Sequence, residues 1–248
     1  MIETAHNNLP HETARFNMPR EAARFNMPRE TARFNMIEQQ IRTWEVLDPT
    51  VLQLLSDVPR ENFVPKEYLG LAFADIEIPL GHGQTMLSPK LEGRILQALK
   101  VQKTHSVLHI GTGSGYFTAL LASLAKQVIS IEIEADLSAQ AAKNLAKNNI
   151  QNVTLEVADA VLGRPSNHSA NMQFYDVIVY TGSSPVEPAG VRQQLNIGGV
   201  LFMVLGQAPA MQATLIQRVS KTGFKQDVLF ETCIPELMYA PQAQKFEF

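Results

Sequence analysis

The sequence contains little of what disulfide frameworks, signal peptides and membrane spans require. Cys233 is its only cysteine, which excludes an intrachain disulfide and a metal site built from several thiolates. No apolar run approaches the roughly 20 residues that a transmembrane helix needs, and the opening segment lacks the apolar stretch of a secretory signal. We therefore expect a cytoplasmic protein in a reducing compartment, without a metal site.

An excess of charge of either sign is also missing. The chain has 21 Lys and Arg residues against 24 Asp and Glu residues, a formal net charge of -3 over 248 residues. Binding to a polyphosphate or an anionic membrane needs clustered cations. Neither nucleic acid nor a membrane is therefore expected as a partner. The hydrophobic fraction of 45% is enough for the core of one α/β domain.

A nine-residue unit occurs three times in tandem between residues 14 and 40, as ARFNMPREA, ARFNMPRET and ARFNMIEQQ. One copy is too short to stack on its neighbours as a solenoid repeat does. Pro19 and Pro28 interrupt a helix in the first two copies, whereas Ile37 allows a helix to run through the third. Arg and Phe side chains of the unit could form a basic and aromatic arm, but its Glu residues offset the charge. We predict a poorly ordered extension over residues 1–35.

The domain that follows, residues 36–248, divides into a cap over residues 36–100 and a core over residues 101–248. Prolines punctuate the short elements of the cap, whereas short β-branched runs alternate with helical segments in the core. Helices are predicted over residues 51–58, 90–100, 117–125 and 135–148, and strands over residues 106–110, 127–133, 153–157, 175–180 and 200–205.

This alternation predicts a doubly wound, Rossmann-like α/β fold, because strand–helix–strand units of this length pair in parallel through right-handed crossovers. Pro185 follows Ser184, a residue type favoured at helix N-caps, so a further helix is predicted from there to the glycine pair at residues 198–199. The runs at residues 211–220 and 227–234 are expected to form an antiparallel pair that closes the sheet.

The strongest chemical signal is VLHIGTGSGY, in which an apolar strand runs directly into Gly111, Thr112, Gly113 and Gly115 and then into a helix. Glycine is required where a turn is tight and a ligand lies against the backbone, because a Cβ atom would collide there. Ligands bind at the carboxyl ends of the strands in such sheets. The loop is therefore a candidate cofactor site, although it could equally hold the pyrophosphate of a dinucleotide.

Neighbouring residues favour an adenosine over a pyrophosphate. Tyr116 stands where a dinucleotide fingerprint requires its last glycine. Glu132, at the end of the second strand, can accept hydrogen bonds from both ribose hydroxyls. Asp159, after the third strand, can accept from an adenine amino group, and Ala160 leaves room for the ring. This pattern is similar to that of the S-adenosylmethionine-dependent methyltransferases.

Segments outside the cofactor loop resemble one family of these enzymes, the protein-L-isoaspartate O-methyltransferases. The resemblance covers residues 36–235, and GHGQT at residues 81–85 is its most specific segment. In the family this segment closes over the methyl donor, which implies that Gln84 and Thr85 contact it. The other segments, in the family's order, are VPRENFVP at 58–65, LAFADIEIPL at 71–80, SIEI at 130–133 and LNIGGVLFMVLG at 195–206.

The resemblance implies methyl transfer to the free α-carboxylate of isoaspartyl residues in damaged proteins. This chemistry is consistent with a sequence that shows no evident acid–base motif. A carboxylate with an ordinary pKa of about 3.9 is ionised at neutral pH and needs no general base. The enzyme has to align the carboxylate oxygen, the methyl carbon and the sulfonium, and to exclude water.

One position departs from the family pattern. The family has a serine after Gln-Thr-Ile, and Leu87 occupies its place here. Ser88 is adjacent, but neighbouring side chains of an extended segment point to opposite faces, so Ser88 does not simply replace that hydroxyl. Thr85 shares the face of Leu87 and is the preferred candidate to contact donor or substrate, with Ser88 as the second.

Three further positions carry weaker expectations. His82 lies between two glycines and could either hydrogen-bond near the carboxylate or order its loop. Thr181, at the end of the fourth strand, is expected to face the cofactor. Asp57 and Arg60 are expected to form a surface pair at a helix end, without a catalytic role.

Two other functions stay open at this point. Leu87 is consistent with a relative that methylates another carboxylate or a hydroxyl. The other alternative is a protein that binds S-adenosylmethionine without catalysing methyl transfer.

Overall fold

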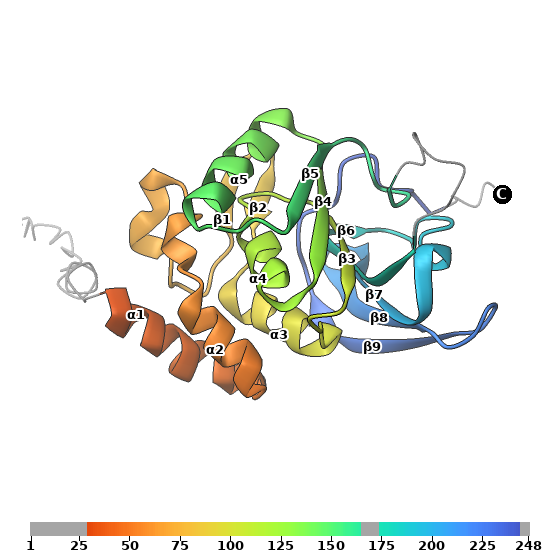
Figure 1. The fold of residues 1–248 in the computed structure, drawn as a ribbon, viewed down its shortest axis with the longest axis horizontal. Coiled ribbons are helices and arrows are strands. Elements are labelled where there is room, and N and C mark those ends of the chain that lie inside the picture. Colours follow the sequence, from red (N-terminus) through yellow and green to blue (C-terminus); the bar gives the residue numbers. More distant parts are fainter. Residues whose placement is uncertain (1–28, 165–173, 244–248) are drawn as a thin grey trace, which may run out of the picture.

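The computed structural model describes residues 29–164 and 174–243. Its N-terminal part is built from short elements (Figure 1), several of which begin at or just after a proline. At α2, for example, Pro49 occupies the first helical turn, and the Asp48 carboxylate accepts hydrogen bonds from the backbone N–H groups of Thr50 and Val51. The elements of this part are α1 (Arg29–Asn35), the π-helix η2 (Met36–Ile41), the 3-10 helices η3 (Arg42–Trp44), η4 (Arg60–Asn62) and η5 (Lys66–Leu71), α2 (Pro49–Asp57), β1 (Ile78–Gly81), β2 (Gln84–Met86) and α3 (Pro89–Leu99).

The third copy of the repeat is helical, as Ile37 predicts. Elements α1 and η2 run through it without a break, and η3 follows directly after η2. Arg33 of this copy pairs with Glu61 at 2.5 Å, which attaches α1 to the cap. The first copy and most of the second lie outside the described residues.

The core is a seven-stranded sheet with the order β5-β4-β3-β6-β7-β8-β9. The first five strands in this order are parallel, and β8 and β9 continue the sheet in antiparallel register. This confirms the predicted Rossmann-like fold and its closing antiparallel pair. The elements are β3 (Ser106–Ile110), α4 (Tyr116–Leu124), β4 (Gln127–Glu132), α5 (Ala135–Lys147), β5 (Val153–Val157), β6 (Tyr175–Ser184), η6 (Arg192–Gln194), β7 (Leu195–Gln207), β8 (Ala210–Arg218) and β9 (Phe224–Thr232).

The two faces of the sheet are covered differently. Alternate side chains of each strand point to opposite faces, so Val107 and Leu108 belong to separate hydrophobic clusters. The cluster that contains Val107 also holds side chains of α2, α3, α4 and α5. In the part of the chain that the structure describes, the cluster that contains Leu108 is formed by strand and loop side chains, such as Val191, without an α-helix.

The helix predicted between residues 185 and 198 is wrong. Strand β6 continues to Ser184, whose hydroxyl donates to the carbonyl of Val186 and caps no helix. Gly190 adopts a left-handed conformation with φ of +82°, and β7 begins at Leu195. The crossover therefore has room only for a loop and the 3-10 turn η6. The helix-start pattern of Ser184 and Pro185 was outweighed by the pairing of β6 with β7.

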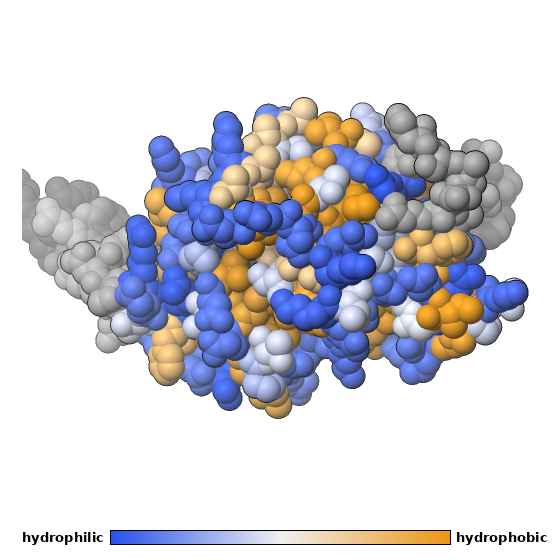
Figure 2. Space-filling model, in the orientation of Figure 1, coloured by the Kyte–Doolittle hydropathy of each residue, from blue (hydrophilic) through white to orange (hydrophobic). Residues whose placement is uncertain are grey.

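The surface in Figure 2 is hydrophilic over most of the view, with apolar side chains gathered near the β5 edge of the sheet. Val157 at the end of β5 is 56% exposed. Within residues 29–164 and 174–243, no helix combines the length and the hydropathy that crossing a membrane requires.

Candidate active site

The glycine loop after β3 has the backbone that only glycine adopts readily. The φ angles of Gly111, Gly113 and Gly115 are +92°, +52° and +84°. A Cβ atom at Gly111 would lie 2.9 Å from the Thr181 hydroxyl oxygen, and one at Gly113 would lie 3.1 Å from a methyl group of Leu80. The loop therefore packs closely against neighbouring segments at the carboxyl edge of the sheet, and glycine at these positions allows that close approach.

Glu132 lies beside this loop and is almost fully buried. Its Oε2 accepts a hydrogen bond from the N–H of Gly113 at 2.8 Å, and its Oε1 accepts from the N–H groups of Ile133 and Glu134 at 3.0 and 3.2 Å. A carboxylate offers about four acceptor positions. These three bonds fix the carboxylate and leave Oε2 with a position for a further donor, such as a ribose hydroxyl.

The other predicted contacts of the nucleoside lie around the same edge. Asp159 is exposed after β5, and its Oδ1 accepts from the N–H of Val161 at 3.0 Å. Ala160 is buried in the same hydrophobic cluster as Leu108. Thr112 is also buried, and its hydroxyl lies 2.7 Å from the Ser130 hydroxyl below the loop. The Thr112 side chain therefore supports the loop from beneath.

His109, a residue that the sequence argument did not single out, lies at the centre of a buried polar network under the glycine loop. The Thr181 hydroxyl donates its one proton to the carbonyl of Gly111 at 2.7 Å. His109 Nε2 lies 3.0 Å from the same hydroxyl oxygen, so Nε2 carries the hydrogen and donates to Thr181. Its Nδ1 then accepts from the hydroxyl of Thr118 or Ser130, at 2.9 and 3.0 Å. Burial lowers the pKa of His109 to about 3, so the ring is neutral. The sequence signal that could have found this network is a histidine within the otherwise apolar run of β3.

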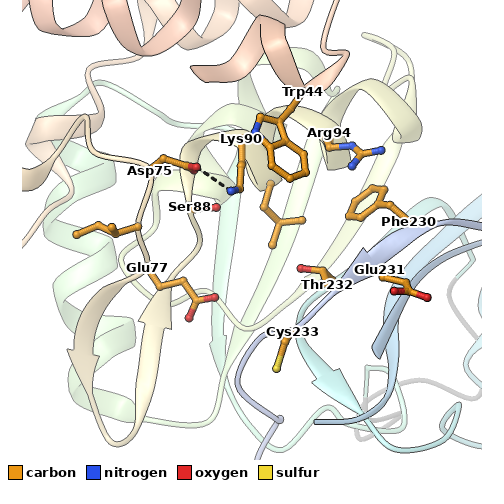
Figure 3. Close-up of a pocket in the computed structure, with 12 residues that line it drawn as sticks. Trp44, Asp75, Glu77, Ser88, Lys90, Arg94, Phe230, Glu231, Thr232 and Cys233 are labelled. Carbon is orange, nitrogen blue, oxygen red and sulfur yellow. Dashed lines mark ion pairs between the residues drawn. The ribbon is translucent and has the colours of Figure 1, made fainter. Parts of the chain in front are cut away.

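The acceptor segment, residues 84–88, comprises β2 and the two residues before α3, and it contains both candidate hydroxyls, Thr85 and Ser88, as well as Leu87 in the place of the family's serine. Thr85 is half-buried, and its hydroxyl donates to Glu77 at 3.0 Å. Leu87 is buried in the main hydrophobic cluster. Ser88 precedes α3, makes no side-chain capping hydrogen bond, and lines a cavity (Figure 3). Gln84 is half-buried and pairs with Gly81 across the β1–β2 hairpin.

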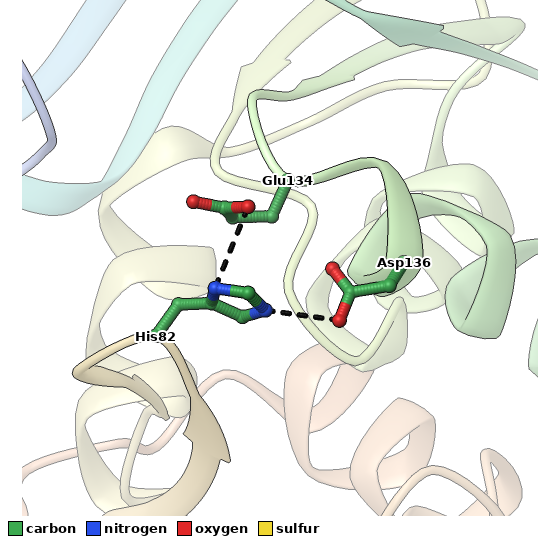
Figure 4. Close-up of side chains that lie close together, drawn as sticks. All are labelled: His82, Glu134 and Asp136. Carbon is green, nitrogen blue, oxygen red and sulfur yellow. Dashed lines mark hydrogen bonds and ion pairs between the residues drawn. The ribbon is translucent and has the colours of Figure 1, made fainter.

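The turn of the β1–β2 hairpin reaches the start of α5, next to Glu132. His82, with φ of +53°, places its Nε2 2.9 Å from Asp136 Oδ2 and its Nδ1 3.5 Å from Glu134 Oε2 (Figure 4). The hydrogen bond with Asp136 raises the pKa of His82 above its ordinary value. The loop-ordering role that was one of the two expectations for His82 agrees with these contacts.

The expectation that Asp57 and Arg60 pair on the surface is wrong. Asp57 accepts a hydrogen bond from Gln53 on the exposed side of α2. Arg60 is 1% exposed and forms an ion pair with Glu92, which is equally buried. A charged residue next to a helix end is most often solvated, so local sequence gave no sign of this burial.

Arg60 connects four parts of the molecule. Its Nε donates to the carbonyl of Ala72 at 2.9 Å and its Nη2 to the carbonyl of Leu87 at 2.7 Å. Its guanidinium carbon lies 5.0 Å from the ring centroid of Tyr116, at the start of α4. Burial raises the pKa of Glu92, and the contact with Arg60 opposes the rise. The acceptor segment is thus tied to the cap and to the helix that follows the glycine loop.

The parallel sheet, the glycine loop and the acid at the end of the second strand of the core define a Rossmann-like methyltransferase that uses S-adenosylmethionine. A crystal structure from Plasmodium falciparum, described as a protein-L-isoaspartate O-methyltransferase in complex with S-adenosyl-L-homocysteine, has the same fold. The TM-score is 0.71 at 18% sequence identity, over 82% of this chain and 96% of that one.

Sequence comparison identifies the family. Residues 31–245 match the model of the protein-L-isoaspartate(D-aspartate) O-methyltransferase family. The chain is 38% identical over 182 residues to protein-L-isoaspartate O-methyltransferase 2 of Marinobacter nauticus, which covers 73% of this chain and 81% of the relative. It is 36% identical over 186 residues to the enzyme of Magnetococcus marinus, covering 75% and 79%.

The chain therefore belongs to the protein-L-isoaspartate O-methyltransferase family, as the GHGQT segment predicted. It is an S-adenosylmethionine-dependent transferase that methylates isoaspartyl residues in proteins.

Proposed function

We propose that this enzyme methylates the free α-carboxylate of L-isoaspartyl residues at the carboxyl edge of its sheet. The hydrogen bond of 2.8 Å between the Gly113 N–H and Glu132 Oε2 carries the assignment, because it brings the glycine loop and the proposed ribose acceptor together. In this assignment Gly111, Thr112, Gly113 and Gly115 form the floor of the donor site. The remaining donor contacts are assigned to Gln84, Thr85, Glu132, Asp159, Ala160 and Thr181.

Bound S-adenosylmethionine supplies an electrophilic methyl group on a sulfonium. The protein contributes by holding the nucleoside and by placing the acceptor carboxylate. The β1–β2 hairpin contributes to closing the site, since Leu80 lies against Gly113 and His82 against Asp136. A closed site that excludes water favours a step in which opposite charges neutralise each other.

The acceptor hydroxyl is assigned to Ser88, with Thr85 as the second candidate. The side chain of Leu87, which holds the place of the family's serine, is buried in the core and offers no hydrogen bond. The Thr85 hydroxyl already donates its proton to Glu77. The Ser88 hydroxyl lies in a cavity wall and caps no helix, so it can donate to a carboxylate.

The reaction is tested with purified protein, labelled donor and a pair of peptides that differ only in an isoaspartyl or an aspartyl linkage. The expected result is labelling of the isoaspartyl peptide alone. Labelling that occurs only with a cell extract would indicate another carboxylate or hydroxyl acceptor. Donor binding without transfer to either peptide or to the extract would indicate a protein that binds S-adenosylmethionine without catalysing transfer.

The acceptor assignment is tested with Ser88→Ala and the matched variant Thr85→Val. Loss of one hydrogen bond to a charged group should lower kcat/KM for the isoaspartyl peptide by about tenfold or more in Ser88→Ala. A larger loss in Thr85→Val than in Ser88→Ala would move the role to Thr85.

We further propose a cytoplasmic enzyme that uses neither nucleic acid nor a membrane as partner. The net charge of -3 and the single cysteine support this proposal. The division into an extension over residues 1–35, a cap over residues 36–100 and a core over residues 101–248 is proposed from the positions of the repeat, the prolines and the alternating strand and helix patterns.

A further inference from the structure

A cavity of about 350 Å³ opens beside Ser88, between the cap, the first turns of α3 and the end of β9 (Figure 3). Trp44 comes from the cap, Arg94 from α3, and Phe230 and Cys233 from the segment that ends the sheet. These residues come from three segments that are far apart in sequence, and the fold brings them together around a residue of the acceptor segment.

The cavity is lined by aromatic rings with cations stacked on them. Arg94 places its guanidinium carbon 3.8 Å from the ring centroid of Phe230. Lys90 Nζ lies 4.3 Å from the ring centroid of Trp44 and 2.7 Å from Asp75 Oδ2. These contacts hold the side chains of Arg94 and Lys90 against the rings, so apolar surface of Trp44, Leu91 and Phe230 lies beside charged groups of both signs in a preformed cavity.

We propose that this cavity binds a side chain of the polypeptide that flanks the isoaspartyl residue, and that it selects large apolar or aromatic side chains. The inference rests on the proposed function, because Ser88 belongs both to the cavity wall and to the acceptor site. A substrate whose carboxylate reaches Ser88 must continue along the chain, and the cavity offers apolar surface directly beside that residue.

The size of the cavity agrees with this occupant. Sites for small molecules span about 300–1,000 Å³, so a cavity of about 350 Å³ holds one large side chain with its adjoining backbone. It is too small for a folded element of the substrate protein. The enzyme would therefore read an extended, accessible segment around the damaged residue.

The charges of the cavity argue against an acidic occupant. Asp75 neutralises Lys90. The other charged lining residues are one cation, Arg94, and two anions, Glu77 and Glu231. An acidic side chain would bring a second negative charge beside the acceptor carboxylate at Ser88 and would lose hydration on entry. An aromatic side chain would instead bury apolar area against the rings of Trp44 and Phe230.

Substrate selection is measured with isoaspartyl peptides that carry phenylalanine, glycine or glutamate at the positions on either side of the isoaspartyl residue. The phenylalanine peptide should exceed the glycine peptide in kcat/KM by about tenfold, as expected for burial of one large apolar side chain in a preformed pocket. The glutamate peptide should be the poorest of the three. Equal kcat/KM for all three would overturn the inference while leaving the proposed function intact, whereas transfer to none of them would overturn both.

Cys233 provides a direct readout of occupancy, because it is the only cysteine of the chain, is exposed and lines the cavity. At a concentration of ten times its Kd, the phenylalanine peptide should slow alkylation of Cys233 by iodoacetamide about tenfold, in proportion to the remaining free cavity. If the peptide is methylated but the alkylation rate of Cys233 is unchanged, the flanking side chain binds elsewhere.

The aromatic wall is tested with Phe230→Ala and the control Val228→Ala, an exposed residue on the same strand outside the cavity. Phe230→Ala should bring the ratio of kcat/KM between the phenylalanine and glycine peptides close to one, and Val228→Ala should preserve the ratio. Because the ratio compares two peptides on one enzyme preparation, partial unfolding of a variant does not change it. An unchanged ratio in Phe230→Ala would contradict the proposed cavity.

Discussion

Arg60 donates a hydrogen bond from Nη2 to the carbonyl oxygen of Leu87 at 2.7 Å, and this contact holds the backbone of the acceptor segment against the buried guanidinium. The same guanidinium is paired with Glu92 in a fully buried site. The stability of the protein and the geometry of the acceptor site therefore depend on one side chain.

Removing Arg60 should be strongly destabilising. Arg60→Ala leaves the Glu92 carboxylate buried without its partner, for which a loss of about 3–5 kcal/mol in the free energy of unfolding is typical. Urea unfolding monitored by circular dichroism measures it. The double variant Arg60→Met with Glu92→Leu should be more stable than Arg60→Ala, because no charge is then buried, while the carbonyl groups of Ala72 and Leu87 still lose their donor. If its loss equals the sum of the losses in Arg60→Met and Glu92→Leu alone, the pair is not coupled.

Restoring the family's serine should separate stability from activity. Leu87→Ser removes a buried side chain from the core, and such truncations cost about 2–5 kcal/mol. Activity toward the isoaspartyl peptide, per folded molecule, should be unchanged or higher. Leu87→Ala is the matched control, because it loses the packing without gaining the hydroxyl. If Leu87→Ser is less active than Leu87→Ala, the acceptor site has been rebuilt around leucine.

Glu132 should dominate the affinity for the donor. Glu132→Gln removes the charge that the N–H groups of Gly113, Ile133 and Glu134 stabilise, and it weakens the acceptor offered to a ribose. Hydrogen bonds to charged groups contribute about 1.5–3 kcal/mol, so binding of S-adenosylhomocysteine should weaken about tenfold or more by calorimetry. The matched variant Glu67→Gln, at an exposed residue of η5, should bind as the parent does. Equal affinity in Glu132→Gln and the parent would refute the ribose role.

The contact between His82 and Asp136 should make donor affinity depend on pH. The pKa of His82 is raised, so its interaction with Asp136, Glu134 and Glu132 is complete below about pH 6.5 and is lost as the pH rises through the raised pKa. Affinity for S-adenosylhomocysteine should fall over this window, and high salt should reduce the effect. His82→Ala should show the weaker affinity at every pH. The same pH slope in the parent and in His82→Ala would assign it to another group.

Buried His109 should reduce stability at acidic pH. Its pKa is about 3 in the folded protein, so between that value and about pH 6.5 the unfolded chain binds a proton that the folded protein does not. The free energy of unfolding should therefore decrease by up to about 1.4 kcal/mol for each unit of pH below 6.5 on account of this residue alone. Denaturant titrations from pH 4.5 to 7.5 compare the parent with His109→Gln, which should show a smaller slope. Parallel curves for the two proteins would exclude this contribution.

Much of the fold and of the donor site was predictable because it depends on local and periodic features. β-branched runs at residues 106–110 and 153–157 coincide with β3 and β5, and helical periodicity located α4 and α5. The glycine loop follows directly from the end of a strand, so its place at the carboxyl edge was implied by the parallel topology. Glu132 was placed beside the loop by the same argument.

The acceptor side was less predictable, because its contacts join residues far apart in the chain. Arg60 and Glu92 are 32 positions apart, and nothing in the sequence between them indicates that both charges are buried. The helix predicted after Pro185 is missing, because strand pairing takes the residues at both of its ends.

The sequence by itself determined the class of the protein, since side-chain alternation, helical period and glycine conformation act over a few residues. Only the tertiary structure decided which polar groups are buried together, as in the network of His109 and in the pair of Arg60 with Glu92. It also decided that Leu87 joins the core and that Ser88 faces a cavity. The physical reason is that burial and pairing depend on which distant segments pack together.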